Sequence, residues 1–309
     1  MLTPARESLP PDTLIGPYRV IETIGKGGFS LIYLARNEET GDEVVIKEFM
    51  PKKIARRDRR GQVVPLEPQY TENLHRGLKL FFQEVKALAS LRHPNIVRVL
   101  HFFLANRTGY LVMPNERGRN LGSYIQERRG GLSTTFILDV FLPILDALAL
   151  LHQRSMLHLD VKPGNIHLRH GSEPLLLDLG AVHPLNRGRA RGGQVGPWTD
   201  VYAVGASIRT CMEGRTPPPA LERHQHDKLV PAMVELKNRY PAFLLEAVDW
   251  AMSMDPTKRP QDAAELLGVL TRHVGNLPHS RFSELAPENW LKQAPLTPAA
   301  NPAAADLPP

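Results

Sequence analysis

The chain has 309 residues, a net charge of +6 and a single cysteine. This length suits one large domain or two modest ones, and one cysteine excludes an internal disulfide and is typical of a reducing, cytoplasmic compartment. The basic runs Pro51–Arg60 and Asn186–Arg191 lack interleaved aromatic residues and any nucleic-acid-binding motif, so we expect no nucleic-acid partner, while acidic protein segments stay open as partners.

The first part of the chain has the pattern of a small β-sheet. Residues 1–17 form an N-terminal extension without the apolar segment of a signal peptide. From Tyr18 to Lys47, β-branched residues alternate with polar ones between glycines, which predicts three short antiparallel strands. The basic, turn-rich stretch from Met50 to about Arg76 has too few apolar residues for a core, so we interpret it as an insertion.

An amphipathic helix is expected after this insertion. Apolar residues between Phe81 and Leu88 recur at helical spacing, and Glu84 falls on the same stripe. An acid on the buried face of a helix requires a cationic partner. Two further strands are expected at Ile96–Phe103 and Tyr110–Met113.

The rest of the chain is predicted to be mostly helical. The polar link Pro114–Gly122 precedes helices expected at about Ser133–Gln153, Thr199–Met212, Pro241–Ser253 and Gln261–Val274. The most apolar run, Phe136–Leu151, contains two aspartates and a proline and is shorter than the roughly 20 residues that span a bilayer, so no membrane segment is expected. Residues 275–309 are rich in proline and alanine, which predicts a disordered tail.

The β-rich part carries a glycine-rich turn and a lysine that suit phosphate binding. Glycines in Gly25-Lys26-Gly27-Gly28-Phe29-Ser30 let backbone N–H groups approach phosphate oxygens, although a plain hairpin turn has a similar sequence. Lys47 ends the apolar strand that begins at Val44. Its ammonium group can reach phosphates if an acid such as Glu84 orients it.

The helical part contains the most specific motif, His158-Leu159-Asp160-Val161-Lys162-Pro163-Gly164-Asn165. It resembles the catalytic loop H-R-D-x-K-x-x-N of eukaryotic-type serine/threonine protein kinases, the Hanks-type kinases of bacteria. Asp178-Leu179-Gly180 resembles the D-F-G motif of that family, and Asp200–Gly205 and Asp255–Pro260 resemble two motifs further along the large lobe. The resemblance extends from about Tyr18 to Val274, in the family's order.

The resemblance implies an α+β, two-lobed protein-kinase-like fold. Its small β-rich N-lobe would comprise residues 18–113, and the hinge and larger helical C-lobe would comprise residues 114–274. The implied activity is transfer of the ATP γ-phosphate to serine or threonine hydroxyls of protein substrates, with Mg²⁺ as cofactor. Oligomeric state and the identity of the substrate do not follow from it.

The resemblance also assigns roles to individual residues. Asp160 would accept or orient the proton of the substrate hydroxyl, and Lys162 would neutralise charge on the transferred phosphoryl group. Asn165 and Asp178 would bind Mg²⁺, a hard cation that prefers oxygen ligands. The residues implied to contact ATP are Ile24, Gly25, Lys26, Gly27, Gly28, Phe29, Ser30, Ile32, Lys47, Glu84, Pro114 through its carbonyl and Glu116 through its N–H.

The sequence departs from the family pattern in the large lobe. Leu159 replaces the arginine of H-R-D, so any activity is not expected to depend on an arginine contact to a phosphorylated activation loop. The interval between Gly180 and Asp200 is much shorter than in the family and lacks the alanine-proline-glutamate-like motif. Arg259 would pair with that glutamate, so we expect either another acid beside it or an outward-turned side chain and a less stable lobe.

Two further departures lie where adenine would bind. His167 stands at the position of an apolar residue beneath the base, and Val45 replaces the small alanine above it. Three functions therefore stay open. These are a protein kinase, impaired if the short activation segment weakens substrate docking, a pseudokinase that binds ATP and acts as a scaffold or allosteric regulator, and a small-molecule kinase of the aminoglycoside-phosphotransferase type. Lys162 argues against the last of these.

Overall fold

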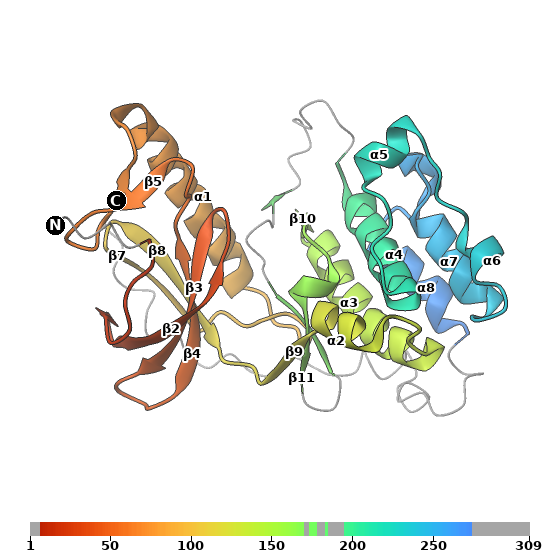
Figure 1. Cartoon of the computed structure of the whole chain (residues 1–309), viewed down its shortest axis with the longest axis horizontal. Coiled ribbons are helices and arrows are strands. Elements are labelled where there is room, and N and C mark those ends of the chain that lie inside the picture. Colours follow the sequence, from red (N-terminus) through yellow and green to blue (C-terminus); the bar gives the residue numbers. More distant parts are fainter. Residues whose placement is uncertain (1–6, 170–172, 178–182, 185–194, 274–309) are drawn as a thin grey trace.

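The computed structural model describes residues 7–169, 173–177, 183–184 and 195–273. It has a smaller lobe built on an antiparallel sheet and a larger, mainly helical lobe, at the left and right of Figure 1. This is the two-lobed α+β arrangement predicted from the sequence. The expected tail from residue 275 lies outside the described residues.

The small lobe contains a six-stranded antiparallel sheet with the strand order β1-β2-β3-β4-β8-β7. The strands are β1 (Leu14–Ile15), β2 (Tyr18–Lys26), β3 (Ser30–Asn37), β4 (Glu43–Phe49), β7 (His101–Ala105) and β8 (Thr108–Pro114). β7 begins later than the predicted strand at Ile96. The reason is that Val97 N–H donates to the Leu176 carbonyl, so the chain there is bonded to the large lobe and not to this sheet.

The stretch after Met50 forms regular structure. It contains the hairpin of β5 (Ala55–Arg57) and β6 (Val63–Pro65), then the 3₁₀ turn η1 (Pro68–Tyr70) and helix α1 (Thr71–Ala89). The hairpin has no core of its own, as expected. However, Ala55 and Val63 are buried in the core of the small lobe, so this insertion is an integral part of the lobe.

The large lobe is organised around one buried helix, α3 (Thr134–Gln153). Its first turn is capped by the Ser133 hydroxyl, which accepts from Phe136 N–H at 3.2 Å. The helices around it are α2 (Leu121–Arg128), α4 (Pro197–Glu213), α5 (Ala220–Gln225), α6 (Ala232–Glu235), α7 (Ala242–Ala251) and α8 (Ala263–Thr271). Among the described residues α3 alone is long and apolar enough to cross a membrane, and 67% of that stretch is buried inside the protein, as in a core helix.

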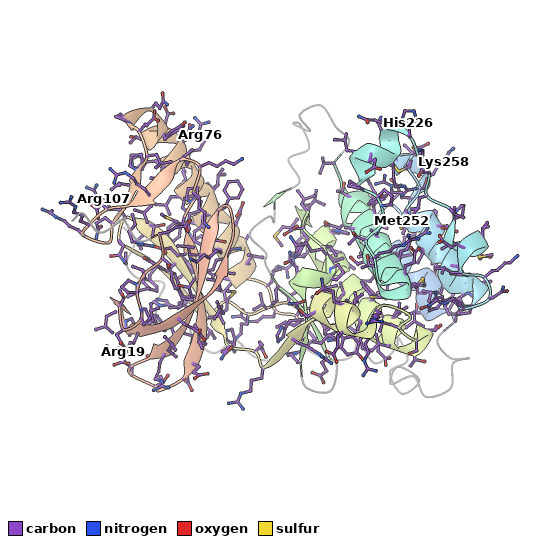
Figure 2. All side chains as sticks on the ribbon, in the orientation of Figure 1. Arg19, Arg76, Arg107, His226, Met252 and Lys258 are labelled. Carbon is purple, nitrogen blue, oxygen red and sulfur yellow. The ribbon has the colours of Figure 1, made fainter. Side chains whose placement is uncertain are left out.

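The part of the large lobe that faces the small lobe contains short strands. β9 (Gly118–Asn120), β11 (Ile166–Arg169) and β12 (Pro174–Leu176) form a sheet of order β12-β11-β9, and β10 (Met156–Leu157) pairs with β13 (His183–Pro184). The link after Pro114 therefore contains a strand that the sequence analysis missed. Figure 2 shows Met252 inside the helical lobe and the exposed His226 and Lys258 at its rim.

Candidate active site

A cavity of about 530 Å³ lies between the two lobes. Its lining comes from β2, β3, β4, α1 and β8 of the small lobe and from β9, η2 (Pro163–Asn165) and β11 of the large lobe. Of the predicted ATP- and metal-binding residues, those that line it are Ile24, Ile32, Lys47, Glu84, Pro114, Glu116 and Asn165. More than half of the remaining lining is apolar, so the cavity suits a largely apolar group with polar groups at its edge.

Lys47 and Glu84 meet in this cavity from different elements. Lys47 is on β4 opposite Leu111 of β8, and only 8% of it is exposed. Glu84 lies on α1 among Phe81, Val85 and Leu88, which are buried. Burial raises the pKa of Glu84 to about 7, and the charge of Lys47 opposes this shift. The predicted cationic partner of Glu84 is therefore within electrostatic reach.

The glycine-rich turn lies at the edge of the cavity. Ile24 before it and Ile32 after it line the cavity, whereas Gly25 to Ser30 do not. Gly27 N–H donates to the Ser30 carbonyl at 2.8 Å and closes the turn between β2 and β3. A Cβ on Gly28 would meet no atom within 4 Å, so the space over this part of the turn is open.

The catalytic-loop residues form one hydrogen-bonded group below the cavity. Lys162 Nζ lies 2.8 Å from both carboxylate oxygens of Asp160. The Asn165 side-chain amide donates to the Asp160 carboxylate and to its backbone carbonyl, each at 2.8 Å. Asp160 and Lys162 are partly exposed, and Asn165 is buried. The loop therefore exposes a carboxylate and an ammonium group to solvent, and the buried Asn165 side chain holds Asp160 in place.

His158 connects this loop to the strand that precedes Asp178. Its Nδ1 accepts from Asp160 N–H at 3.3 Å, so Nε2 carries the proton and donates to the Leu177 carbonyl at 3.2 Å. Leu177 N–H in turn donates to the Asn165 carbonyl. His158 therefore has a structural role, which is to tie the loop to this strand. Asp178 and the shortened interval after it lie mostly outside the described residues.

A buried carboxylate supports the catalytic loop from the large lobe. Asp200, which is fully buried at the start of α4, accepts from His158 N–H at 2.8 Å and Leu159 N–H at 2.7 Å. Leu159 has a φ of +59°, in the left-handed region that β-carbon sterics disfavour. His152 Nε2 also lies 3.0 Å from Asp200. The Asp200 side chain therefore supports the backbone of the loop that carries Asp160.

The residues predicted to face adenine lie at one edge of the cavity. Pro114 ends β8 opposite Val44, and both Pro114 and Glu116 line the cavity. His167 lines it from β11, and its Nε2 is buried without a hydrogen-bond partner among the described residues. Arg119 and Asn120 of β9 also line it and were missed, although Asn120 has a helix-capping signal: it accepts from Ser123 N–H at the start of α2.

Arg259 does not turn outward, and no ion pair holds it among the residues that the structure describes, although the charge of Asp255 acts on it. It is half-buried, it donates to the carbonyls of Ser253 and Met254, and its guanidinium carbon is 4.7 Å from the centre of the Tyr202 ring. Burial lowers the pKa of Arg259, and the charge of Arg223 adds to this effect. The expected outward turn was wrong, and the expected acid acts only through its charge, because carbonyl oxygens and an aromatic face satisfy the guanidinium group directly.

A family model for the protein kinase domain matches residues 18–198, and the chain belongs to this family. Its relatives include three bacterial serine/threonine-protein kinases. PrkC of Bacillus subtilis is 30% identical over 65% of this chain and 31% of its own length. PknK of Mycobacterium tuberculosis is 27% identical over 84% and 24%, and the probable kinase PknB of Lactococcus lactis is 24% identical over 81% and 41%. The chain thus spans less than half the length of these relatives.

Two solved structures resemble the fold. The PpkA-294 apo form matches with a TM-score of 0.75 and 28% identity over 86% of this chain and all of that one. Rad53 residues 1–466 in complex with AMP-PNP match with a TM-score of 0.62 over 82% of this chain and 65% of that one, and at 20% identity this likeness shows the fold alone. The predicted Hanks-type family and two-lobed fold are confirmed.

Proposed function

We propose that this chain is an ATP-dependent serine/threonine protein kinase. The observation that carries the proposal is the hydrogen-bonded group of Asp160, Lys162 and Asn165, in which Asn165 lines the same cavity as Lys47 and Glu84. ATP would be the substrate in the cavity, with adenine between the aliphatic walls and its edge at the Pro114 carbonyl and the Glu116 N–H. Protein serine and threonine hydroxyls would be the acceptors.

Each polar residue has a distinct task in this proposal. Lys47 binds phosphate oxygens of the nucleotide, and Glu84 orients its ammonium group. Asp160 accepts a hydrogen bond from the acceptor hydroxyl and receives its proton as the oxygen–phosphorus bond forms and the bond from the γ-phosphorus to the oxygen of the leaving ADP breaks. Lys162, which is 2.8 Å from Asp160, stabilises negative charge on the phosphoryl group during transfer.

The donor set also suits Mg²⁺. Asn165 provides an amide oxygen and Asp178 a carboxylate, which are the oxygen ligands that this cation prefers. Within the described residues no cluster of three or more acidic, histidine or cysteine side chains could hold a metal alone, and phosphate oxygens and waters would complete the shell. When bound, Mg²⁺ would neutralise charge on the phosphates.

The proposal is tested by transfer of labelled γ-phosphate from ATP to a generic protein substrate. Asp160→Asn should reduce the rate by at least about a hundredfold, because it removes the proton acceptor and keeps the shape. Asp42→Asn is a matched control, since Asp42 is exposed on the loop between β3 and β4. Equal transfer by the wild type and Asp160→Asn would refute the proposal.

A pseudokinase that binds ATP and acts as a scaffold is the second candidate. It is favoured by the short interval between Gly180 and Asp200, in which protein kinases have the segment that docks the protein substrate. Positions 181–199 contain no glutamate or aspartate, so the glutamate of the alanine-proline-glutamate motif has no counterpart there. Stabilisation of the wild type by ATP and Mg²⁺ in a thermal-shift titration, together with no labelled product, would favour this scaffold. Efficient phosphorylation of a basic protein would exclude it.

A further inference from the structure

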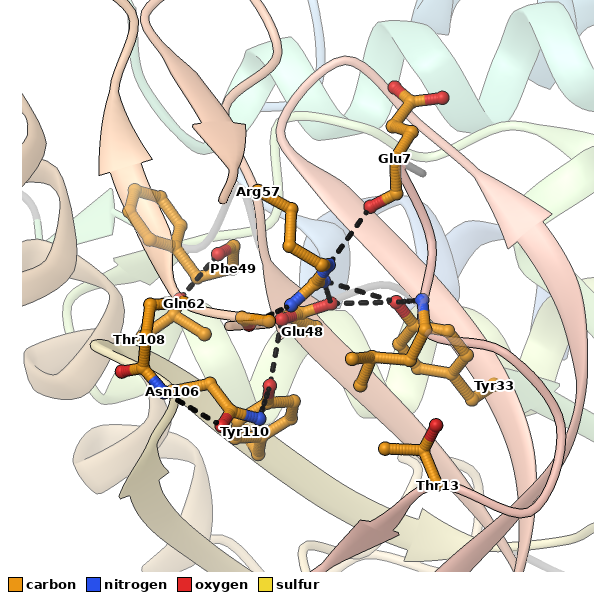
Figure 3. Close-up of polar contacts among 12 residues, drawn as sticks. Glu7, Thr13, Tyr33, Glu48, Phe49, Arg57, Gln62, Asn106, Thr108 and Tyr110 are labelled. Atoms are coloured by element: carbon orange, nitrogen blue, oxygen red, sulfur yellow. Dashed lines mark hydrogen bonds and ion pairs between the residues drawn. The ribbon is translucent and has the colours of Figure 1, made fainter. Parts of the chain in front are cut away.

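Glu48 follows Lys47 on β4 and faces the opposite side of the sheet. Figure 3 shows it at the centre of a buried polar group. Glu48 is fully buried and accepts from the hydroxyls of Tyr33 at 2.7 Å and Tyr110 at 2.8 Å. Burial, together with the charge of Glu48, raises the pKa of both tyrosines. Both therefore stay protonated and act as donors to the carboxylate.

The third donor to Glu48 comes from the insertion. Arg57 of β5 is 4% exposed, and its Nη2 lies 2.6 Å from Glu48 Oε2. The same guanidinium group donates to the carbonyls of Glu7 at 3.2 Å and Gly61 at 2.8 Å. Burial lowers the pKa of Arg57, but the charge of Glu48 and its hydrogen bond outweigh this effect and raise the pKa overall. Such a pair is stable in the interior only when its hydrogen bonds are complete.

The insertion also reaches the glycine-rich turn. Met50 N–H donates to the Phe29 carbonyl at 2.8 Å, and Lys52 N–H donates to the Gly28 carbonyl at 3.0 Å. Lys52 Nζ is in turn 2.9 Å from a carboxylate oxygen of Glu7. The backbone of Met50 and Lys52 thus holds the glycine-rich turn from outside the cavity. Both residues belong to the short segment between the end of β4 at Phe49 and the start of β5 at Ala55.

We propose that Arg57 is a positioning residue for the glycine-rich turn. By attaching the hairpin to Glu48, it fixes the path of residues 50–52, whose N–H groups hold the carbonyls of Gly28 and Phe29. A glycine-rich turn has much conformational freedom to lose when it closes over a ligand. Restricting the turn beforehand reduces that loss and tightens binding. The benefit to ATP binding rests on the proposed function, whereas the ordering of the turn does not.

The test compares Arg57→Met with Arg19→Met. The control removes a surface pair, Arg19 with Glu38, at 39% and 40% exposure. Amide hydrogen exchange of Gly27, Met50 and Lys52, measured without nucleotide, should be at least about tenfold faster in Arg57→Met than in the wild type and unchanged in the control. In kinase assays the KM for ATP should rise about tenfold and kcat should stay within about twofold. Arg57→Lys should give exchange rates and a KM for ATP between those of the wild type and Arg57→Met.

Two outcomes would overturn the proposal. These are unchanged exchange in a folded Arg57→Met protein, and faster exchange with an unchanged affinity for ATP. If Arg57→Met does not fold, Glu48→Gln/Arg57→Met removes the uncompensated buried charge, and the same two measurements apply to it. Exchange is measured without nucleotide, so the two proposals can fail separately. If the wild type shows no phosphoryl transfer, the proposed kinase activity is refuted. Faster exchange in Arg57→Met would in that case still support the ordering of the turn by Arg57.

Discussion

Replacing Asp200 should affect stability and activity together. The carboxylate accepts from His158 N–H, Leu159 N–H and His152 Nε2, at 2.8, 2.7 and 3.0 Å. His152 Nδ1 accepts from Ala263 N–H at 3.2 Å, so Nε2 carries the proton and is a true donor to Asp200. Asp200→Ala leaves all three buried donors without an acceptor. Asp200→Asn keeps one acceptor and directs an amide N–H toward another donor.

The expected loss follows from these contacts. A hydrogen bond to a charged group contributes about 1.5–3 kcal/mol, and such contributions are not additive within one network. We therefore expect Asp200→Ala to lower the free energy of unfolding by about 4 kcal/mol and Asp200→Asn by about 2 kcal/mol. Without these bonds Leu159 can leave its left-handed conformation, which costs on the order of 1–3 kcal/mol to maintain, and Asp160 then shifts.

Urea unfolding followed by circular dichroism measures the loss by linear extrapolation. The control is Asp42→Ala at an exposed site, where we expect a change below about 0.5 kcal/mol. At urea-free conditions where Asp200→Asn is still folded, phosphoryl transfer should fall at least about tenfold. A fully active, equally stable Asp200→Ala protein would refute the reasoning that this side chain supports the loop.

Three smaller predictions concern single side chains. The pKa of Glu84 rises from 4.5 to about 7 on folding, so the folded state binds its proton more tightly than the unfolded state. As the pH rises from 4.5 to about 7, the free energy of unfolding should therefore fall, by about 1 kcal/mol after allowance for solvent screening. Glu84→Gln should abolish that slope in urea titrations at several pH values; an unchanged slope would contradict it. His167→Leu removes a buried nitrogen that has no hydrogen-bond partner in the described part of the chain, so it should raise the free energy of unfolding by roughly 1 kcal/mol and with it Tm; a lower Tm would count against this. Burial raises the pKa of the Cys211 thiol, so it should react with a thiol reagent in urea and not in the folded protein.

The segments that sequence predicted well are those governed by local pattern. The apolar spacing of α1 correctly predicted that Glu84 lies on the buried face of the helix. The long apolar run from Phe136 to Leu151 correctly predicted the buried helix α3. The catalytic loop was identified because its residues are close together in sequence. Their hydrogen bonds in the structure, from Lys162 and Asn165 to Asp160, join residues at most five positions apart.

The features that sequence missed depend on distant partners. Arg57 is one of several cations in a basic run, where nothing in the sequence sets it apart, and its burial depends on Glu48, Tyr33 and Tyr110. The same holds for Arg259, whose half-buried site is completed by the Tyr202 ring. β7 starts late because Val97 bonds across to Leu176 in the other lobe. None of these contacts leaves a periodic signal in the chain.

Two oppositely charged neighbours on β4 make the register of that strand intolerant of change. Successive side chains of a strand point to opposite faces, so Lys47 lines the cavity while Glu48 lies among the tyrosines. A one-residue deletion inside the strand would move a carboxylate into the cavity and an ammonium group into the buried network. Length variation should therefore be confined to the exposed loop at 38–42, which can lengthen without moving either charge to the other face.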